Sequence, residues 1–381
     1  MNNNNSTHKR FEALDAFRGI CALAVVVYHT RLIGSMTELA FFRGSAIFVE
    51  FFFVLSGFVL AHGYGYRSTG LQFQPFMLAR LRRLYPLHLF MFLVFFALEI
   101  GKLLAYKLSG FVFNNPPFTN YLAFREILPN LLLIHAWVPF ADHYSYNYPS
   151  WSISIEFYLY ALLFVSIMGF RSRQVLVWTV ASLFAFGLML MDVASGIQWL
   201  PTQVVRGLAC FFGGAMTYAF YRKISHWQAS RLLGSIVETG LLIAVLVVVC
   251  TDFAARAVLA PALFFVTVLC FAFEAGIFSG LLSLGSMQYI GKLSYSIYMT
   301  HAAILFCLIS VAMVLQKASG IEMAPMIDGT RFLDFGSDWL NTGVALFIAG
   351  IVMYISSLTY KFVEVPGQQL RFKRKAQGVS S

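Results

Sequence analysis

Long runs of apolar residues divide this chain into segments that are each close to the length of a membrane-spanning helix. The runs cover approximately residues 12–33, 46–64, 84–105, 150–169, 175–192, 204–222, 234–252, 254–275, 286–315 and 338–363. An α-helix needs about 20 mostly apolar residues to cross the hydrocarbon core of a bilayer. The pattern therefore predicts an all-α fold, a polytopic membrane bundle of about ten transmembrane helices.

One further apolar run, from Ile127 to Val138, is shorter and is bracketed by Pro129 and Pro139. A run of this length is more typical of a re-entrant or interfacial segment than of a membrane span. Cytoplasmic loops of membrane proteins are rich in Lys and Arg, and this bias gives a second test. If 127–138 crossed the membrane, the basic loops after it would lie outside, so we expect that it does not cross.

With both termini placed in the cytoplasm, most of the basic loop residues gather on the inside. These residues are Lys9, Arg10, Arg67, Arg80, Arg82, Arg83, Arg171, Arg173, Arg222, Lys223, Arg231, Arg371, Lys373, Arg374 and Lys375. Lys102 and Lys107 fit this orientation less well. We therefore expect a cytoplasmic tail (1–11), a membrane domain (12–366) and a basic cytoplasmic tail (367–381).

Composition supports a membrane protein, because 59% of the 381 residues are hydrophobic and only 12% are charged, about half the charged fraction of a soluble domain. The net charge of +10 is spread over loops, so it bears on topology and we predict no nucleic-acid partner. The first apolar run lacks a clear cleavage site, which favours a retained helix over a removed signal peptide. The cysteines form no CxxC pair and fall in apolar runs, so we expect buried thiols and no metal site; they are Cys21, Cys210, Cys250, Cys270 and Cys307.

The first apolar run carries a cation, Arg18, and a titratable imidazole, His29. Ionisable groups inside a membrane helix are expensive and indicate a functional site by default. The residues are eleven positions apart, so both side chains lie on one helix face, separated by roughly 16 Å along the axis at about 1.5 Å per residue. That face would carry a charge near one membrane surface and a proton acceptor deep in the bilayer.

Two other apolar runs place titratable groups at a depth that we expect to be similar to that of His29. Glu156 follows a helix start after Pro149, and His301 lies late in the run that begins near residue 286. Three groups at one level favour a shared site. The alternative is that each is a core residue satisfied separately by a carbonyl or a hydroxyl, and for Glu156 or His301 alone the two interpretations are about equal.

Two polar features have more than one interpretation. Arg80, Arg82 and Arg83 lie at the predicted inner surface, where they would act as topology anchors, bind anionic lipid or clamp phosphates. Ser56 and Gly57 lie in a bulky helix, and small residues there predict close helix packing. Ser56 does not lie in a GxSxG motif, so we do not expect it to be a nucleophile.

Six motifs occur in the order found in the acyltransferase-3 family of integral membrane acyltransferases, which the chain resembles over nearly its whole length. They are Leu14-Asp15 with Arg18 and His29, Phe53-Val-Leu-Ser56-Gly57-Phe58, Arg83-Leu-Tyr85-Pro86, Trp151-Ser152-Ile-Ser-Ile-Glu156, Leu293-Ser-Tyr295-Ser-Ile-Tyr298-Met-Thr-His301 and Tyr360-Lys-Phe-Val-Glu364-Val-Pro366. The resemblance implies transfer of an acyl group, most often acetyl, from cytoplasmic acyl-CoA to a hydroxyl of an extracytoplasmic glycan or lipid-linked sugar, in a bacterial cytoplasmic membrane.

By the same resemblance, His29 is the catalytic histidine and Arg18 its essential partner. Arg80 and Arg82 match a donor-side Arg-x-Arg motif, with Arg83 adjoining it. Glu156 is expected to orient the imidazole of His29. Support for the site is expected from motif positions Asp15, Ser152, Tyr298 and His301. Many relatives carry an added SGNH hydrolase domain, and we expect the form without it.

The rival function is a secondary transporter of a sugar or lipid, since ionisable groups at one depth are also typical of transporters. The absence of an internal repeat and of paired broken helices weighs against it. The residues leave open the acceptor, the acyl chain length, the oligomeric state and whether a covalent acyl-histidine forms.

Overall fold

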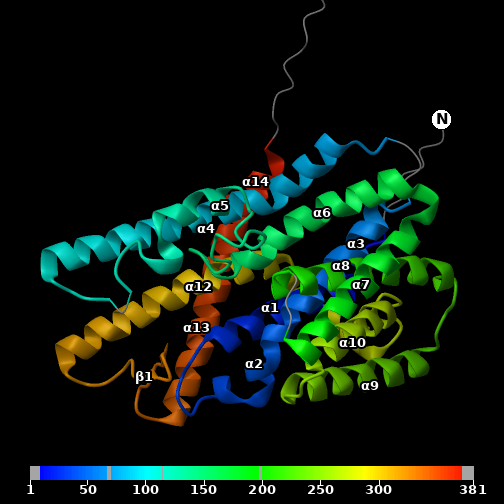
Figure 1. Cartoon of the computed structure of the whole chain (residues 1–381). Coiled ribbons are helices and arrows are strands. Elements are labelled where there is room, and N and C mark those ends of the chain that lie inside the picture. The colour runs from blue at the N-terminus through cyan, green and yellow to red at the C-terminus, as the bar shows by residue number, and fades with distance from the viewer. Residues whose placement is uncertain (1–8, 67–69, 114, 197–199, 371–381) are drawn as a thin grey trace, which may run out of the picture.

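The computed structural model describes residues 9–66, 70–113, 115–196 and 200–370, and 77% of the chain is helical. Figure 1 shows the arrangement of its helices. The α-helices are α1 Glu12–His29, α2 Ala40–Gly44, α3 Phe48–Tyr64, α4 Phe73–Ser109, α5 Ile127–Leu131, α6 Ser150–Phe170, α7 Gln174–Ser195, α8 Thr202–Ile224, α9 Arg231–Cys250, α10 Arg256–Phe271, α11 Ile277–Leu282, α12 Gly285–Ser319, α13 Asp338–Thr359 and α14 Val365–Gln369.

Short 3₁₀-helical turns, one π-helical turn and one small β-hairpin lie between these helices. The 3₁₀ turns are η1 Met36–Glu38, η2 Ser45–Ile47, η3 Asn120–Leu122, η4 Phe124–Glu126 and η5 Arg171–Arg173, and the π-helical turn is η6 Tyr360–Glu364. Strands β1 Met326–Ile327 and β2 Thr330–Arg331 pair antiparallel around Asp328 and Gly329, both of which have positive φ. The hairpin lies between α12 and α13, in the segment that ten spans with both termini in the cytoplasm would place outside.

Each predicted apolar run coincides for most of its length with one long helix, and the predicted all-α membrane bundle is confirmed at this coarser level. Among the described residues, six helical stretches are long and apolar enough to cross a membrane. One of these, Ser150–Ser195, contains both α6 and α7. The count of about ten spans stays a prediction, as do the cytoplasmic location of the termini and the domain limits. The predicted terminal charges at positions 371–375 and Arg67 lie outside the described residues.

The short apolar run 127–138 forms only the five-residue helix α5 followed by turns. A helix of this length is too short to cross a bilayer. Tyr85 donates a hydrogen bond to the carbonyl of Leu131 (3.0 Å), and the ring Nε2 of His88 lies 3.0 Å from the carbonyl of Asn130. The segment is therefore fastened against α4 instead of spanning.

Glycines allow the two helices that carry most of the site, α1 and α12, to touch along their backbones. A Cβ on Gly19 of α1 would lie 2.6 Å from the backbone nitrogen of Gly291 in α12, and one on Gly291 would strike the carbonyl of Asp15. Close helix contact through small residues is a common packing mode in membranes. It places Arg18 of α1 directly beside Ser294 of α12.

The predicted close packing at Gly57 is also confirmed. A Cβ on this residue of α3 would overlap the carbonyl of Phe211 in α8, and one on Gly214 of α8 would overlap the carbonyl of Val54. The pair α3 and α8 therefore packs backbone to backbone in the centre of the bundle. Ser56, the neighbour of Gly57, points to a different partner, described below.

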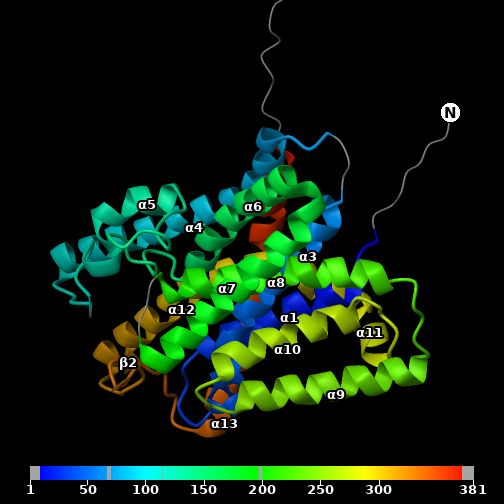
Figure 2. The same ribbon diagram turned by 45° about the vertical axis from the view of Figure 1, so that its right-hand side comes forward.

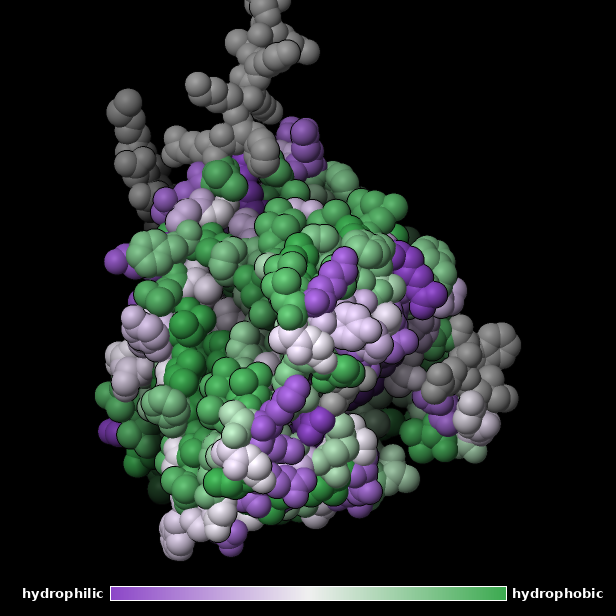
Figure 3. All heavy atoms as spheres, turned by 90° about the vertical axis from the view of Figure 1, so that its left-hand side faces the viewer, coloured by the Kyte–Doolittle hydropathy of each residue, from purple (hydrophilic) through white to green (hydrophobic). Residues whose placement is uncertain are grey.

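Helix α9 lies at the periphery of the bundle and exposes apolar side chains along its length (Figure 2). These include Leu232, Ile236, Ile243, Leu246 and Val247. Hydrophobic side chains also predominate on the face seen from the left of Figure 1, with hydrophilic ones gathered in patches (Figure 3). A surface of this kind is suited to lipid.

Candidate active site

A cavity of about 70 Å³, lined by apolar side chains and a set of charged and hydroxyl groups, lies inside the bundle and is walled entirely by helices. We call it the inner cavity. Its lining contains five of the residues singled out in the sequence, on four helices: Arg18, Arg83, Ser152, Glu156 and Tyr298. Helix α3 contributes the remaining wall with Ser56 and several apolar side chains.

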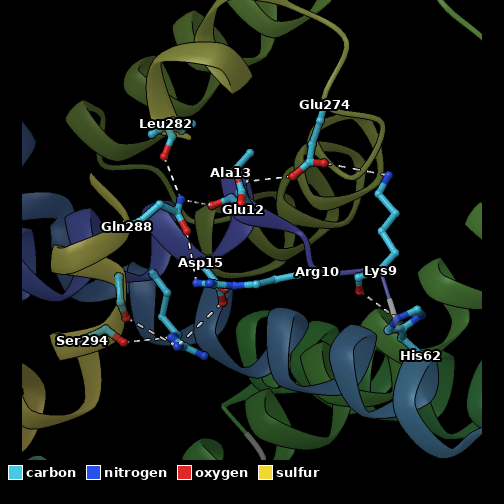
Figure 4. A network of polar contacts seen from close by, with 12 residues as sticks. Lys9, Arg10, Glu12, Ala13, Asp15, His62, Glu274, Leu282, Gln288 and Ser294 are labelled. Carbon is cyan, nitrogen blue, oxygen red and sulfur yellow. Dashed lines mark hydrogen bonds and ion pairs between the residues drawn. The ribbon is translucent and has the colours of Figure 1, made fainter. Parts of the chain in front are cut away.

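Arg18 enters the inner cavity from α1, close to the N-terminal end of that helix. Its Nε donates a hydrogen bond to Ser294 Oγ (2.8 Å), and its Nη2 donates to the carbonyl of Gly291 (3.4 Å). Asp15 Oδ1 lies 3.9 Å away, but Asp15 makes a closer ion pair with Arg10, at 2.7 Å. Figure 4 shows this network, in which Arg10 and Gln288 join the start of α1 to α12. Asp15 is therefore shared between Arg10 and Arg18.

Glu156 faces Arg18 across the same cavity. Its Oε1 accepts short hydrogen bonds from the hydroxyls of Ser56 and Tyr160. Arg83 of α4 also lines the cavity and is attracted by the carboxylates of Glu156 and Glu364. Two guanidinium groups and these carboxylates thus lie together at one end of the bundle.

The three clustered arginines do not all face one place. Arg83 lines the inner cavity, whereas Arg80 donates a hydrogen bond to the hydroxyl of Tyr64 (3.0 Å) and lies over the Tyr64 and Phe76 rings. Arg82 is two residues from Arg80 along a helix, a step of about 200°, so these two point in different directions. The expected three-arginine clamp is therefore not assembled as one cluster.

His29 lies in a second and larger cavity of about 530 Å³, which we call the outer cavity. This cavity is walled partly by loops, including the β1–β2 hairpin through Gly329, Thr330 and Arg331. Figure 1 shows the hairpin and α14 at opposite ends of the molecule. The outer cavity therefore reaches the end that the charge pattern assigns to the outside.

The hydrogen bonds of His29 define which ring nitrogen carries the proton. Nδ1 lies 3.0 Å from the carbonyl of Val25, which accepts only, so Nδ1 holds the hydrogen. His301 Nε2 lies 3.2 Å from the same Nδ1 and is placed as an acceptor. The other nitrogen of His29, Nε2, then keeps its lone pair and is able to accept a proton.

The similar depth expected for Glu156, His29 and His301 stays a prediction, but the structure places Glu156 in a different cavity from His29. His301 does touch His29, but Glu156 shares the inner cavity with Arg18 and bonds Ser56 and Tyr160. Its expected role in orienting the imidazole of His29 is not supported by any contact among the described residues. Val25 and His301 hold the ring instead.

Two predicted support residues connect the cavities. Tyr298 lines the inner cavity, its hydroxyl is 3.0 Å from Ser152 Oγ, and its ring centroid lies 6.0 Å from that of His301. His301 in turn contacts His29, which lines the outer cavity. A continuous path of side chains therefore runs from one cavity to the other.

Sequence reasoning missed several residues of the outer cavity. Tyr148 packs against both histidines, with ring centroids 4.8 Å from His29 and 5.7 Å from His301. Glu99 and Lys102 line the same cavity and form a buried ion pair at 2.8 Å. The poor fit of Lys102 to the positive-inside rule was a signal for this pair, because a lysine away from the cytoplasmic surface needs a partner.

The comparisons with known proteins agree with the motifs. The profile of the family Acyl_transf_3, described as an acyltransferase domain, matches residues 11–361.

The chain belongs to the acyltransferase-3 family.

Two curated proteins are similar to parts of this family member. "Protein 2 in picA locus" of Rhizobium radiobacter is 34% identical over 113 residues, which is 29% of this chain and 53% of that protein. "Acyltransferase MdmB" of Streptomyces mycarofaciens is 31% identical over 160 residues, 40% of this chain and 38% of that protein. The chain thus spans about half or less of the curated relatives that it matches. No solved structure matches it significantly.

Proposed function

We propose that this protein is a membrane O-acyltransferase that moves an acyl group, acetyl by family preference, from cytoplasmic acyl-CoA to a hydroxyl of an extracytoplasmic glycan or lipid-linked sugar. The bacterial cytoplasmic membrane is the proposed location. One observation carries the proposal. His29 has a free Nε2 in the outer cavity, and its contact with His301 leads to Tyr298 of the inner cavity.

The inner cavity is the proposed donor site. Its two guanidinium groups, Arg18 and Arg83, suit the anionic phosphates of acyl-CoA, for which arginine is well shaped. Arg18 and His29 are roughly 16 Å apart along α1, at about 1.5 Å per residue. The long, narrow pantetheine arm of coenzyme A would cover that distance and bring the thioester to Tyr298.

The outer cavity is the proposed acceptor site. Four tyrosines line it, and tyrosine offers both an apolar ring and a hydroxyl to a sugar; they are Tyr28, Tyr121, Tyr146 and Tyr148. The charged pair Glu99 and Lys102 adds hydrogen-bonding groups to the same wall. A glycan would reach this cavity from the end that carries the β1–β2 hairpin.

In the proposed reaction, His29 Nε2 takes the proton from the acceptor hydroxyl. The oxygen of that hydroxyl attacks the carbonyl carbon of the thioester. The Tyr298 hydroxyl would donate to the developing oxyanion. The carbon–sulfur bond then breaks, and the CoA thiolate takes the proton back from His29. Val25 and His301 hold the ring through this cycle. A positioned general base typically contributes about 10²–10⁴ in rate.

The test is the variant His29→Ala. Full-length protein in detergent receives acetyl-CoA and envelope glycan from a deletion strain, and both free CoA thiol and glycan acetylation are measured. We expect a loss of transfer of about 10²-fold or more with unchanged thermal stability. His226→Ala, in the exposed loop before α9, is the matched control.

Near-normal turnover in His29→Ala would overturn the proposal. Glycan movement across a vesicle membrane without thiol release would support the rival transporter instead. Quench-flow with labelled acetyl-CoA and no acceptor separates the two acyl-transfer routes, because a direct transfer leaves no label on the protein.

A further inference from the structure

A third cavity, of about 710 Å³, lies beside the outer cavity, and neither the motifs nor the proposed reaction uses it. We call it the arginine pocket, after its lining residues Arg43, Arg206 and Arg256. These come from α2, α8 and α10, which are far apart in sequence. Tyr28 lines both this pocket and the outer cavity, so the two adjoin at the residue before His29.

The arginine pocket is a built site, because its guanidinium groups are fixed by the backbone. Arg43 donates to the carbonyls of Thr37 (2.6 Å), Val27 (2.9 Å) and Thr30 (3.2 Å). Arg256 donates from Nη2 to the carbonyls of Gly44 (2.7 Å) and Val249 (3.1 Å). Held in this way, they lose little freedom when a ligand binds.

Gly44 belongs to the same arrangement. A Cβ at this position would overlap the carbonyl of Val249 and lie 2.6 Å from an Arg256 nitrogen. The absence of a side chain therefore lets α2 reach the end of α9 and lets Arg256 bridge the two. The glycine at position 44 and the packing of α2 against α9 therefore fix the position of the Arg256 guanidinium.

The lining of the pocket is itself positively charged, with three guanidinium groups and one carboxylate, Asp252. Behind the lining, buried Glu50 pairs with Arg206, and Glu38 attracts Arg43. Among the described residues, Nη1 of Arg43, Nε of Arg206 and Nε of Arg256 are buried without a hydrogen-bond partner. These three nitrogens are covered by protein atoms, so a ligand in the pocket would meet the other, accessible parts of the guanidinium groups.

A capping role explains part of this arrangement but not all of it. Arg43 and Arg256 neutralise carbonyls at the C-terminal ends of α1 and α9, as basic side chains commonly do. Arg206, in contrast, makes no such contact with a helix end among the described residues and is paired with a buried carboxylate. All three also lie at the end that the positive-inside rule would leave poor in arginine.

We propose that the arginine pocket binds a phosphate group carried by an amphipathic molecule. Guanidinium groups match phosphate oxygens in geometry and charge. The rim adds an apolar edge, because Phe253 lines the pocket and is 37% exposed. Leu39 and Leu259 are also exposed, and they lie four and three residues from Arg43 and Arg256 in the sequence. A lipid chain would lie along such an edge while the phosphate enters.

This assignment also selects an acceptor class, a step that rests on the proposed function. A sugar joined to a lipid through phosphate would place its phosphate in the arginine pocket and its ring across Tyr28, in the outer cavity beside His29. A phosphate diester of an ordinary membrane lipid offers the same chemistry without a sugar. Experiment distinguishes the two sources.

The test is native mass spectrometry of the full chain in detergent, titrated with farnesyl phosphate, with farnesol as the matched phosphate-free probe and with phosphatidylglycerol. We expect farnesyl phosphate to bind at least about fivefold more tightly than farnesol. Ala254→Glu adds a negative charge to the exposed rim and should weaken phosphate binding about fivefold, while Asp252→Asn should strengthen it. Arg256→Gln should weaken it further.

Ala318→Glu, at the exposed end of α12 away from the pocket, is the charge control and should change nothing. If Arg256→Gln fails to fold, the two rim variants still decide the result. Preference for phosphatidylglycerol with the same charge dependence supports the phosphate site and assigns it to membrane lipid. Equal binding of farnesol and farnesyl phosphate, or binding that ignores all three pocket substitutions, overturns the proposal. The assay contains no acyl donor, so its failure leaves the proposed function standing, and failure of the His29 test leaves this one standing.

Discussion

The inner and outer cavities lie along the same helix, α1, yet they are built in different ways. The inner cavity is walled by helices alone and is lined by Arg18, Arg83 and Glu156. The outer cavity is closed partly by loops and holds His29 with the buried pair Glu99 and Lys102. A helical wall suits a donor that is always the same molecule. A loop wall suits the proposed acceptor site, because loops tolerate the sequence change that a new acceptor would require.

The largest effect that we predict is a loss of stability when the ion pair in the wall of the outer cavity is broken. Glu99→Leu would leave the Lys102 ammonium buried without its partner and would remove the acceptor for the backbone N–H of Phe118 (2.8 Å). Removing one member of a buried ion pair typically costs about 3–5 kcal/mol. We expect a clear fall in the melting temperature measured in detergent, with loss of transfer.

The double variant Glu99→Leu/Lys102→Leu is the companion measurement. Replacing a whole buried pair by apolar residues is often close to neutral, so stability should largely return while transfer stays low. If the single variant melts like the wild type, the pair does not hold the outer wall, and the contrast between the cavities loses this support.

The next effect concerns the inner cavity. Arg18→Gln removes a charge-assisted hydrogen bond to Ser294 and a cation from the proposed donor site. Hydrogen bonds to charged groups are worth about 1.5–3 kcal/mol, which corresponds to roughly 10- to 150-fold. We expect kcat/KM for acetyl-CoA to fall by that factor, measured as thiol release against donor concentration.

Arg173→Gln, an exposed arginine of η5, controls for loss of charge at the same end of the protein. A normal donor titration in Arg18→Gln would show that the inner cavity does not receive acyl-CoA. That outcome would mean that the acyl donor reaches His29 by a route other than the inner cavity.

These contrasts also show how much the sequence could predict. The helices follow from apolar run length alone, and the inner cavity follows from motif residues that share it, such as Arg18 and Glu156. The separation of Glu156 from His29 could not be predicted, because a position counted along each helix does not say which helices face each other. Glu99 and Tyr148 escaped notice because each becomes polar lining only when α4 and the loop before α6 meet α12.

A smaller effect sharpens the link between the cavities. His301 positions His29 through one neutral hydrogen bond, of a kind worth about 0.5–1.5 kcal/mol. His301→Ala should lower kcat by roughly 2- to 12-fold with KM for acetyl-CoA unchanged. His301→Gln, which keeps a hydrogen-bonding group, should recover most of the rate. A rise in donor KM without a change in kcat would instead assign His301 to binding.

The smallest effect concerns the loop that closes the outer cavity. Asp334, which follows the β1–β2 hairpin, accepts hydrogen bonds at Oδ1 from Asn341 Nδ2 (2.9 Å) and from the backbone N–H of Gly336 (2.9 Å). These bonds favour the charged form and hold the pKa of Asp334 below its ordinary value of 3.8. A group with a depressed folded-state pKa stabilises the fold above its unfolded pKa, and that contribution is lost as the pH falls through the folded pKa. Because Asp334 is partly exposed to solvent, the effect should be small. Below pH 3.8, amide exchange at residues 326–331 should rise slightly in the wild type but stay level in Asp334→Asn, whereas amides around Arg18 should show no such difference. Equal acid sensitivity at both places would mean that the outer wall is not anchored by this carboxylate.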